Sequence, residues 1–393
     1  MRVPGYSFSL LILPCRSFQQ ARPATARAGV VHCRGLADPN AGDQSRAGAE
    51  DARRPPPSVL CVGETLFDSL PEALFLGGAT TNVGVHLASL GTLAAIVTCV
   101  GADRLGRDAI QRLEAKGVDA RYVQRHPSLE TGVVTASLDA NGDASYAFDT
   151  PAAWDAIEMT EALRDLVRTF DGVTVIGTLA SRLGSTQTSA TSASAILELR
   201  DLARDDSVVL DINLRPPWYD PASVLTLCRG SRGGDGDAAP PSGRLALVKL
   251  NEEELPIVEG WCDLRASDAL AGDGLRRRME ALGASLRARR VCVTRGGDGA
   301  ALLLCGNDAG AGGGGAFAER GGRACAAEPG CDTVGAGDAF LAALLRSLLL
   351  EREPAGRALD RACALGAYVA RRRGAVPEHD DAPDELREIF SFA

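Results

Sequence analysis

The sequence predicts an α/β fold around a mainly parallel β-sheet, and three observations support this prediction. First, short apolar runs alternate along the chain with amphipathic stretches of helical length. Second, these runs are apolar at successive positions, which is typical of strands that helices cover on both faces. Third, 393 residues of which 45% are hydrophobic provide enough material for one large domain. The predicted strands are residues 59–62, 94–100, 173–176, 208–212, 245–250 and 291–294, and the amphipathic stretches include residues 107–116 and 189–204.

Two kinds of segment interrupt this pattern. Residues 132–138 and 144–148 flank the sequence DANG at residues 139–142, and Asn-Gly between two strand-like runs predicts a β-hairpin. Residues 230–243 and 306–322 are rich in Gly, Asp and Pro, so we expect flexible surface insertions there.

The junction at residues 332–338, which read DTVGAGD, is the best guide to function. Small residues before a helix leave backbone N–H groups unpaired, and the helix dipole adds positive potential, so the junction favours a phosphate. Asp338 is well placed there to take a proton from a hydroxyl that attacks this phosphate, which makes it the candidate general base. The alternative is a helix that simply begins with an acid after a tight turn, and the segment alone does not decide between the two.

A second glycine-rich helix start lies upstream, where residues 76–83 read LGGATTNV and the apolar positions end at Gly91. Four further segments accompany the two starts: CVGE at 61–64 with Asp68, DINLR at 211–215, NEEE at 251–254 and VTRG at 293–296. In this order they resemble the PfkB (ribokinase-like) carbohydrate kinases, from Ser58 to about Pro377. The GETLFD and GGA sequences, together with AWD at 153–155, are most similar to the fructokinase-type members.

The resemblance implies a ribokinase-like three-layer sandwich over residues 58–393, with a small β lid whose strands lie within about 64–76 and 131–148. It implies ATP-dependent phosphorylation of a monosaccharide, with fructose preferred, and Asp338 as the general base. It further implies Mg²⁺ and allows K⁺. Sugar and ATP are the expected partners, and a homodimer through the lid is one option for assembly.

The resemblance also assigns residues to roles. Phosphoryl transfer would use Gly335, Ala336, Gly337 and Arg215 beside Asp338, and the sugar would contact Asp68, Gly77, Gly78, Asn82, Asp211 and Asn213. ATP would contact Asn251, Thr294, Gly296 and Gly299. Glu254 would hold Mg²⁺ through water, and Asp332 and Val334 would contact a monovalent cation.

Structural explanations compete with some of these roles. Asp68 would equally suit a turn after a strand, and Asn251 would equally suit a helix N-cap, a role compatible with ligand binding. Thr294, Gly296 and Gly299 would also fit an ordinary turn between strands.

The sequence departs from the family pattern at two points. Val334 stands where many relatives have a second Thr, which removes a hydroxyl but keeps a backbone carbonyl. Only eight residues separate Asp68 from Gly77, so we expect a reduced first lid hairpin. This difference weakens the transfer of sugar specificity from the family to this chain.

Other functions stay open. These are a catalytically silent family member that acts as an organelle scaffold, and a kinase for another sugar or a nucleoside. A dinucleotide-dependent oxidoreductase is disfavoured because no G-x-G-x-x-G follows the first strand.

Composition excludes several other classes. A net charge of −9 without clustered Lys or Arg argues against nucleic acid as a partner. The 11 cysteines form no C-x-x-C pair and there are only four His, so the sequence has no zinc-like pattern, and a reducing compartment is the simpler interpretation. The only lysines are Lys116 and Lys249, which we interpret as compositional bias. No stretch is long enough to predict a transmembrane helix.

Residues 1–57 have the composition of an organelle transit peptide and linker. Five Arg and no acid occur through Gly35, and three prolines precede Ser58. The abundance of Ser and Ala favours a plastid over a mitochondrion as the destination. A secretory signal is the weaker alternative. If the segment is not a transit peptide, we expect a cytoplasmic protein.

Overall fold

The structure is a computed structural model, which describes residues 57–70, 73–138, 144–148, 150–182, 187–231, 244–264, 270–305, 316–323, 331, 333–378, 386–387 and 390. The transit-peptide prediction and the predicted turn at Asn141-Gly142 lie outside these residues. A compact unit begins at Pro55 and contains all of the elements below.

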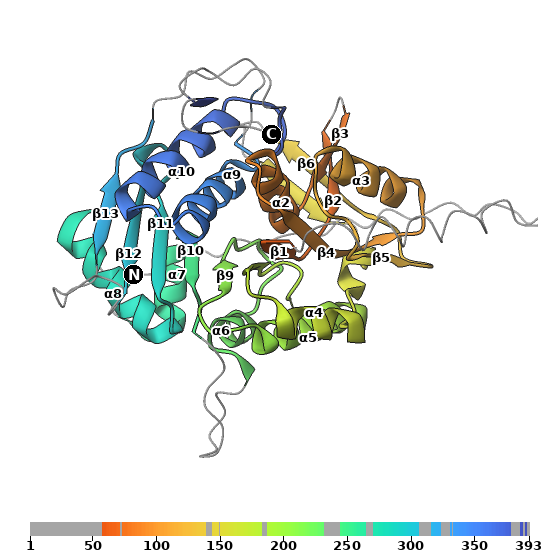
Figure 1. Cartoon of the computed structure of the whole chain (residues 1–393), viewed down its shortest axis with the longest axis horizontal. Coiled ribbons are helices and arrows are strands. Elements are labelled where there is room, and N and C mark those ends of the chain that lie inside the picture. Colours follow the sequence, from red (N-terminus) through yellow and green to blue (C-terminus); the bar gives the residue numbers. More distant parts are fainter. Residues whose placement is uncertain are drawn as a thin grey trace, which may run out of the picture. The chain divides into compact units, whose positions relative to one another are not determined.

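A nine-stranded sheet forms the centre of this unit, in the order β13-β12-β11-β10-β9-β8-β1-β4-β5 (Figure 1). The strands from β11 to β5 in this order pair in parallel, whereas β12 and β13 pair antiparallel at one edge. The sheet is therefore mainly parallel, as predicted. Its strands are β1 (Val59–Val62), β4 (Ala94–Gly101), β5 (Val123–His126), β8 (Val173–Gly177), β9 (Val208–Asp211), β10 (Leu247–Asn251), β11 (Arg290–Thr294), β12 (Ala300–Leu304) and β13 (Phe317–Arg320).

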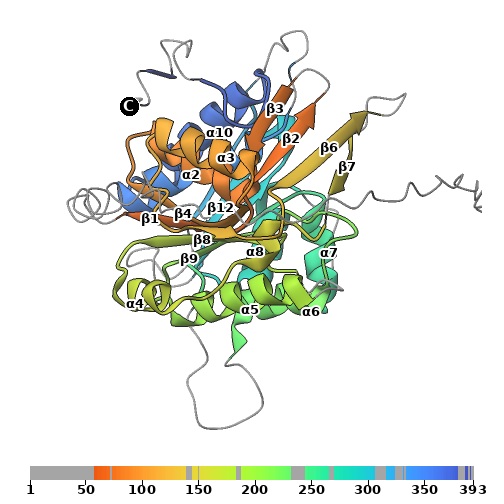
Figure 2. The same cartoon turned by 90° about the vertical axis from the view of Figure 1, so that its right-hand side faces the viewer.

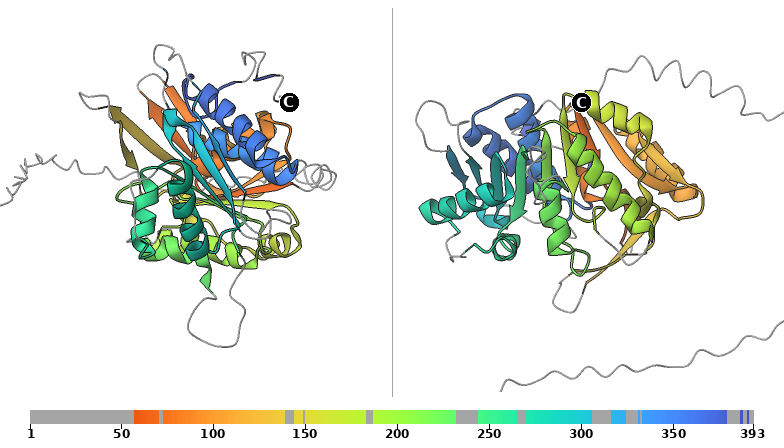
Figure 3. Two further views of the ribbon diagram at one scale, coloured as in Figure 1. Left: turned by 90° about the vertical axis from the view of Figure 1, so that its left-hand side faces the viewer. Right: turned by 90° about the horizontal axis from the view of Figure 1, so that it is seen from below.

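Helices cover both faces of this sheet, which confirms the predicted three-layer α/β sandwich (Figures 1 and 3). One face carries α2 (Ala79–Ser89), α3 (Arg104–Ala115), α9 (Ala336–Leu345) and α10 (Ala355–Val369). The other carries α4 (Glu161–Thr169), α5 (Gln187–Leu202), α6 (Pro221–Arg229), α7 (Glu254–Trp261) and α8 (Gly272–Leu286).

The buried side chains of the strands explain why the apolar runs are continuous. In β1, Val59 and Cys61 belong to the core beneath α2 and α9, while Leu60 and Val62 belong to the core on the opposite face. Because successive side chains of a strand point to opposite faces, a strand between two helical layers needs apolar residues at every position.

Local hydrogen bonds moved some helix boundaries away from the predicted ones. The predicted helix 107–116 begins earlier, at Arg104, because the Asp103 side chain accepts a hydrogen bond from the Gly106 N–H at 2.7 Å. The helix after residues 332–338 is short, since α9 ends at Leu345 and a π-type turn, η6 (Arg346–Leu350), follows it.

The prediction of a flexible insertion over residues 306–322 was wrong at its C-terminal end. Phe317–Arg320 forms β13, which pairs with β12 at the edge of the sheet. The glycines around it masked a four-residue strand that tertiary pairing stabilises. Residues 232–243 and 306–315 lie outside the described part of the chain.

A second, four-stranded sheet has the order β3-β2-β6-β7 and extends away from the central sheet (Figure 2). Its strands are β2 (Leu66–Leu70), β3 (Ala73–Gly77), β6 (Gly132–Leu138) and β7 (Ala144–Phe148). β2 pairs antiparallel with β3 and parallel with β6, so the first hairpin is present with two five-residue strands. We call this sheet the lid; its closing over a sugar and its dimerisation stay predictions.

The chain order of the strands fixes where a ligand would bind. The chain runs from β1 outward through β4 and β5, and then returns to β8 on the other side of β1. At such a reversal, the loops after neighbouring strands separate and leave a crevice at their carboxyl ends. Among the described helices, none combines the length and the apolar character that crossing a membrane requires.

Candidate active site

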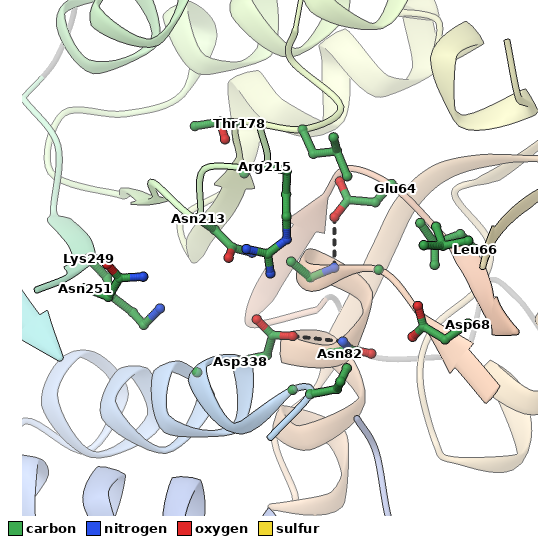
Figure 4. A pocket seen from close by; sticks show the side chains of 18 of the residues that line it. Glu64, Leu66, Asp68, Asn82, Thr178, Asn213, Arg215, Lys249, Asn251 and Asp338 are labelled. Atoms are coloured by element: carbon green, nitrogen blue, oxygen red, sulfur yellow. Dashed lines mark hydrogen bonds between the residues drawn. The ribbon is translucent and has the colours of Figure 1, made fainter. Parts of the chain in front are cut away.

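A polar cavity of about 320 Å³ lies at this crevice, and we call it the central cavity (Figure 4). Loops after β1, β8 and β9, the ends of β10 and β11, the first turns of α2, α7 and α9, and the lid strands β2 and β6 contribute to its lining. The lining residues used below are Glu64, Leu66, Asp68, Gly78, Asn82, Val134, Thr178, Leu179, Asn213, Arg215, Lys249, Asn251, Glu254, Thr294, Val334, Gly335, Gly337 and Asp338.

Asp338 lies in the first turn of α9 and is buried, with 8% of its surface exposed. Gly335 precedes this helix with a φ of 76°, a left-handed conformation that glycine adopts without strain. Gly335 has no side chain to cap α9, and no other described side chain accepts a hydrogen bond from its first turn. The Asn82 side chain of α2 donates a hydrogen bond from Nδ2 to Asp338 Oδ2 at 2.8 Å, and so links the two glycine-rich helix starts across 256 residues (Figure 4).

The surroundings of Asp338 raise its pKa to about 7. Burial is the main cause, and the nearby Asp211 carboxylate adds to it, while the Asn82 hydrogen bond and the Lys249 and Arg215 charges act in the opposite direction. A carboxyl group with this pKa exchanges its proton near neutral pH, which suits a general base.

Lys249 is buried at the end of β10, and its Nζ donates to both carboxylate oxygens of Asp211 at 3.0 and 2.9 Å. Burial lowers the pKa of Lys249, but the Asp211 carboxylate more than offsets this effect, so the pKa is raised and the amine keeps its charge. The ammonium lies about 3.5 Å from where a Cβ on Gly337 would be, beside the first turn of α9. The cavity thus has a fixed positive charge next to its glycine turn.

The Glu254 carboxylate connects the loop after β9 to the end of β10. Its Oε1 accepts the Leu214 N–H at 2.6 Å and its Oε2 accepts the Asn251 N–H at 2.8 Å. Asn251 in turn caps the start of α7, because its Oδ1 accepts the Glu253 and Glu254 N–H groups at 2.9 and 2.8 Å. Asn251 therefore has the predicted helix-capping role, and the side chains of Asn251 and Glu254 both line the cavity.

The loop after β9 carries Asn213 and Arg215 into the cavity (Figure 4). Asn213 adopts a φ of 36°, which lies in the left-handed region that Asn tolerates better than most residues. Arg215 is close enough to Asp338 and Glu64 to act on the pKa of both. Its guanidinium and the Lys249 ammonium supply the positive charge that a transferring phosphoryl group needs.

The turn at Gly77-Gly78 is built around two carboxylates. A Cβ on Gly78 would approach the Glu64 carbonyl oxygen to 2.2 Å, and its φ of 107° also requires glycine. The Glu64 side chain accepts the Ala79 N–H at 2.8 Å, at the start of α2. A Cβ on Gly77 would lie 2.3 Å from Asp68 Oδ2, so Gly77 leaves room for the Asp68 carboxylate without itself lining the cavity.

A second cavity, of about 550 Å³, adjoins the first and shares Thr294, Thr333 and Gly337 with it. Gly296, Gly299 and Ala336 line this cavity, together with Phe340 of α9 and residues of α10. Gly299 has a φ of 93°, and a Cβ on it would lie 2.1 Å from the Arg320 carbonyl oxygen, so β13 requires glycine here. The apolar walls and glycine backbone suit a flat heterocycle.

The predicted site residues therefore divide into three groups. Most of them line one of the two adjoining cavities. Asp211 and Gly77 lie behind the central cavity, where Asp211 holds Lys249 and Gly77 accommodates Asp68. Asp332 lies outside the described residues, while Val334 lines the central cavity.

Sequence reasoning missed Lys249 and Glu64 as site residues. Lys249 was attributed to compositional bias, although a lysine inside a buried strand was a usable signal, since an unpaired ammonium is rarely buried. Glu64 follows β1 within the matched motif, but nothing local shows that its side chain turns inward. Within the described part of the chain, no cluster of three or more His, Cys, Asp or Glu could hold a metal by itself.

Comparisons with known proteins identify the family of the chain. The model described as "pfkB family carbohydrate kinase" matches residues 73–232 and 237–381. The chain is 27% identical over 328 residues to a fructokinase of Salmonella typhimurium, covering 81% of this chain and 94% of that protein. It is 24% identical over 387 residues to the probable fructokinase-6, chloroplastic, of Arabidopsis thaliana, covering 92% and 90%.

A solved structure supports the fold. The crystal structure of fructokinase with bound ATP from Xylella fastidiosa matches with a TM-score of 0.62 at 20% identity, covering 84% of this chain and 98% of that one.

Proposed function

Because the chain belongs to the pfkB family of carbohydrate kinases and is a sugar kinase, we propose that it transfers the γ-phosphoryl group of ATP to a primary hydroxyl of fructose. One observation carries the mechanism: Asp338, with its pKa raised to about 7, lies at the uncapped start of α9 in the cavity that also contains Asp68. The choice of fructose is supported by relatives named fructokinase, at 27–28% identity.

Asp338 would remove the proton from the attacking hydroxyl. The Asn82 amide holds Oδ2 at 2.8 Å, which fixes the orientation of the carboxylate and leaves Oδ1 for the substrate. Asp68, on lid strand β2, and Asn82 would bind sugar hydroxyls on the same side of the cavity. A hydroxyl held in line with the phosphate reacts without a further search for orientation.

The first turn of α9 would stabilise the charge that develops on the phosphoryl oxygens. Among the described residues, the N–H groups of Gly335 and Gly337 have no acceptor, so they are available to an anion, whereas the Ala336 N–H donates to the Thr333 carbonyl at 3.3 Å. Lys249 and Arg215 add positive charge from the other wall. ATP would extend from this turn into the second cavity, towards Thr294, Gly296 and Gly299.

The residues present fit a magnesium ion that is bound mainly through water and phosphate. Mg²⁺ keeps several waters and needs few protein ligands, so the lack of a ligand cluster among the described residues is compatible with it. Each Glu254 oxygen accepts one backbone N–H and has lone pairs left for a metal-bound water. When bound, the ion would supply positive charge that neutralises the phosphates. Asp332 and Val334 remain the expected contacts of K⁺.

The proposal is tested by an ATP-consumption assay of the full chain. The acceptors are fructose, ribose, ketogluconate, fructose 6-phosphate and adenosine, each compared with a blank that contains ATP and no acceptor. Fructose should give the highest kcat/KM. A higher value for ribose or adenosine would replace fructose by that acceptor, and no consumption above the blank with any of them would favour the silent scaffold.

We also propose that the protein acts in a plastid. Support comes from the Arg-rich, acid-free composition of residues 1–35 and from the relative named chloroplastic. Sequencing the N-terminus of the native protein should find a start between about Gly35 and Ser58. An intact Met1 in the cytosol would contradict the proposal.

A further inference from the structure

The lid side of the central cavity contains carboxylates but no cation. We call this side the acceptor wall, because Asp338 faces it from α9. It consists of Glu64, Leu66, Asp68, Asn82, Val134, Thr178 and Leu179. None of these seven residues is Lys, Arg or His, while the cations of the cavity, Arg215 and Lys249, come from the loop after β9 and from β10.

We propose that the acceptor wall selects an uncharged polyol over sugar phosphates and sugar acids, and that Glu64 is a specificity-determining residue that binds a hydroxyl of this acceptor. The proposal rests on the proposed function, and it extends that function to a chemical class of acceptor and to a residue with no assigned role.

Glu64 offers an oxygen that the protein does not use. The side chain is 2% exposed, and Oε1 accepts the Ala79 N–H at 2.8 Å. Oε2 is buried and has no hydrogen-bond partner among the described residues, although Glu64 lines the cavity (Figure 4). A buried carboxylate oxygen without a partner is costly, and a substrate hydroxyl would satisfy it.

The neighbouring backbone supports the same interpretation. Gly78 has to be glycine because a Cβ would collide with the Glu64 backbone, and Gly77 leaves space for the Asp68 carboxylate. The same turn therefore packs against the Glu64 backbone, binds the Glu64 carboxylate through the Ala79 N–H and accommodates the Asp68 carboxylate. Burial raises the pKa of Glu64, and the charges of Arg215 and Arg182 act in the opposite direction. Where ionised, the two carboxylates accept hydrogen bonds from hydroxyl groups and repel a phosphate or a carboxylate on the acceptor.

The segments beside the acceptor wall contain no cation that could neutralise such an anion. Residues 64–82 and 131–149, which include all four lid strands, contain six Asp or Glu and no Lys, Arg or His. This holds for the whole of both segments, because it follows from the sequence. Arg182, behind the wall, is engaged by Asp155 at 2.8 Å and by the ring of Trp154 at 4.1 Å.

Electrostatics therefore decides which acceptors enter. An uncharged sugar meets hydroxyl acceptors at Glu64, Asp68 and Asn82 and apolar contacts at Leu66 and Val134. An anionic sugar of similar shape would lose its hydration without gaining a counter-charge, which is the kind of mismatch that binding sites use for discrimination.

The test measures acceptor binding by isothermal titration calorimetry on the full chain, with fructose, fructose 6-phosphate and ketogluconate as probes. We expect fructose to bind at least about 100-fold more tightly than either anion. Equal or tighter binding of an anion would overturn the proposal. Since binding needs no turnover, fructose that binds but is not phosphorylated would refute only the proposed function.

Glu64→Gln tests the residue itself. The amide keeps an oxygen for the Ala79 N–H but replaces the free acceptor by a donor, so the Kd of fructose should rise about tenfold. The preference over fructose 6-phosphate should shrink, while kcat at saturating fructose should change less than about threefold.

The matched control is Glu158→Gln, which removes a charge from an exposed side chain outside the cavity and should leave all values unchanged. Unchanged fructose affinity in Glu64→Gln would overturn the assignment of Glu64. Equal losses for fructose and ATP would do so too, because they would indicate a structural role only.

Discussion

The two glycine-rich helix starts look alike in sequence but differ in what occupies them. At α2, the Glu64 carboxylate accepts the Ala79 N–H, and Gly78 packs against the Glu64 backbone. At α9, no side chain of the described residues caps the helix, and Gly335 packs instead against the backbone of Ala375. One start is filled by a carboxylate of the protein itself, whereas the other has no such partner among the described residues.

This difference teaches that a glycine-rich helix start is not by itself a phosphate site. The positive end of a helix dipole attracts any anion in reach, and the fold decides whether that anion is a side chain or a ligand. Asn82 and Asp338, one from each helix, join the two starts through a single hydrogen bond. In the proposed function, the acceptor binds at the filled start and the phosphoryl group at the open one.

The largest expected effect comes from Asp338→Asn, which keeps the shape of the open start but removes its base. kcat should fall by about a hundredfold or more, as is usual for the loss of a general base, with little change in sugar binding. Steady-state kinetics on the full chain measures both quantities. The control is Asp273→Asn, which changes an exposed acid in the first turn of α8. Near-normal turnover of Asp338→Asn would remove Asp338 as the base.

Next in size is the effect of Gly335→Ala, and Gly91→Ala is its matched control. Both glycines have a φ of 76°, but a Cβ on Gly335 would lie 2.5 Å from the Ala375 Cα, whereas one on Gly91 would meet nothing within 4 Å. Gly91→Ala should cost about 1 kcal/mol of unfolding free energy for the left-handed conformation.

Gly335→Ala should cost about 1–2 kcal/mol more than this control, because the backbone of Ala375 must also shift, and it should lower kcat. Urea denaturation gives the two free energies. Equal costs would mean that the open start has room for a side chain, contrary to the structure.

The raised pKa of Asp338 at the start of α9 should make the free energy of unfolding depend on pH. The folded pKa of Asp338 is about 7 against an ordinary value of 3.8, so between these values the native protein holds a proton that the unfolded chain has lost. The contribution of Asp338 to stability therefore falls as pH rises from about 4 to 7, and stays low above that.

Asp338→Asn removes this dependence and can still accept the Asn82 hydrogen bond. The variant should melt about 5 °C above the wild type at pH 8, and this gap should narrow as pH falls from 7 towards 4. Thermal denaturation followed by circular dichroism tests it. A gap that widens towards low pH would show that the pKa of Asp338 is not raised. In the wild type, kcat should fall below about pH 7 as the base becomes protonated.

The smallest effect is expected at the filled start. Asp68→Ala should raise the KM for the sugar by about tenfold, because it leaves substrate hydroxyls without their acceptor, and it should hardly change the KM for ATP. Steady-state kinetics with each substrate varied in turn separates the two values. Parallel losses for sugar and ATP would indicate a general folding defect rather than a contact with the sugar.

Much of the fold could be predicted from local patterns. Continuous apolar runs predict strands buried on both faces, and β1 shows why, since its alternate residues enter opposite cores. The two glycine-rich helix starts, strands β6 and β7 and the general position of Asp338 also follow from short segments, whereas the hairpin of β2 and β3 was expected only from the family resemblance. These features are determined within a few residues, by backbone conformation and by the period of the side chains.

Only the tertiary structure decided which polar residues meet. Lys249 and Asp211 are 38 residues apart, and their pairing turned a predicted sugar contact into the support of a buried ammonium. β13 formed in a glycine-rich stretch because β12 offered it an edge, and the Glu64 side chain turned towards α2 because a helix start lay there. The sequence by itself determined the elements and the residue types at their ends. Long-range packing decided that a carboxylate of the protein accepts an N–H group at the start of α2 and that no described side chain does so at the start of α9. The burial of a side chain and its charge partners depend on segments that no local pattern brings together.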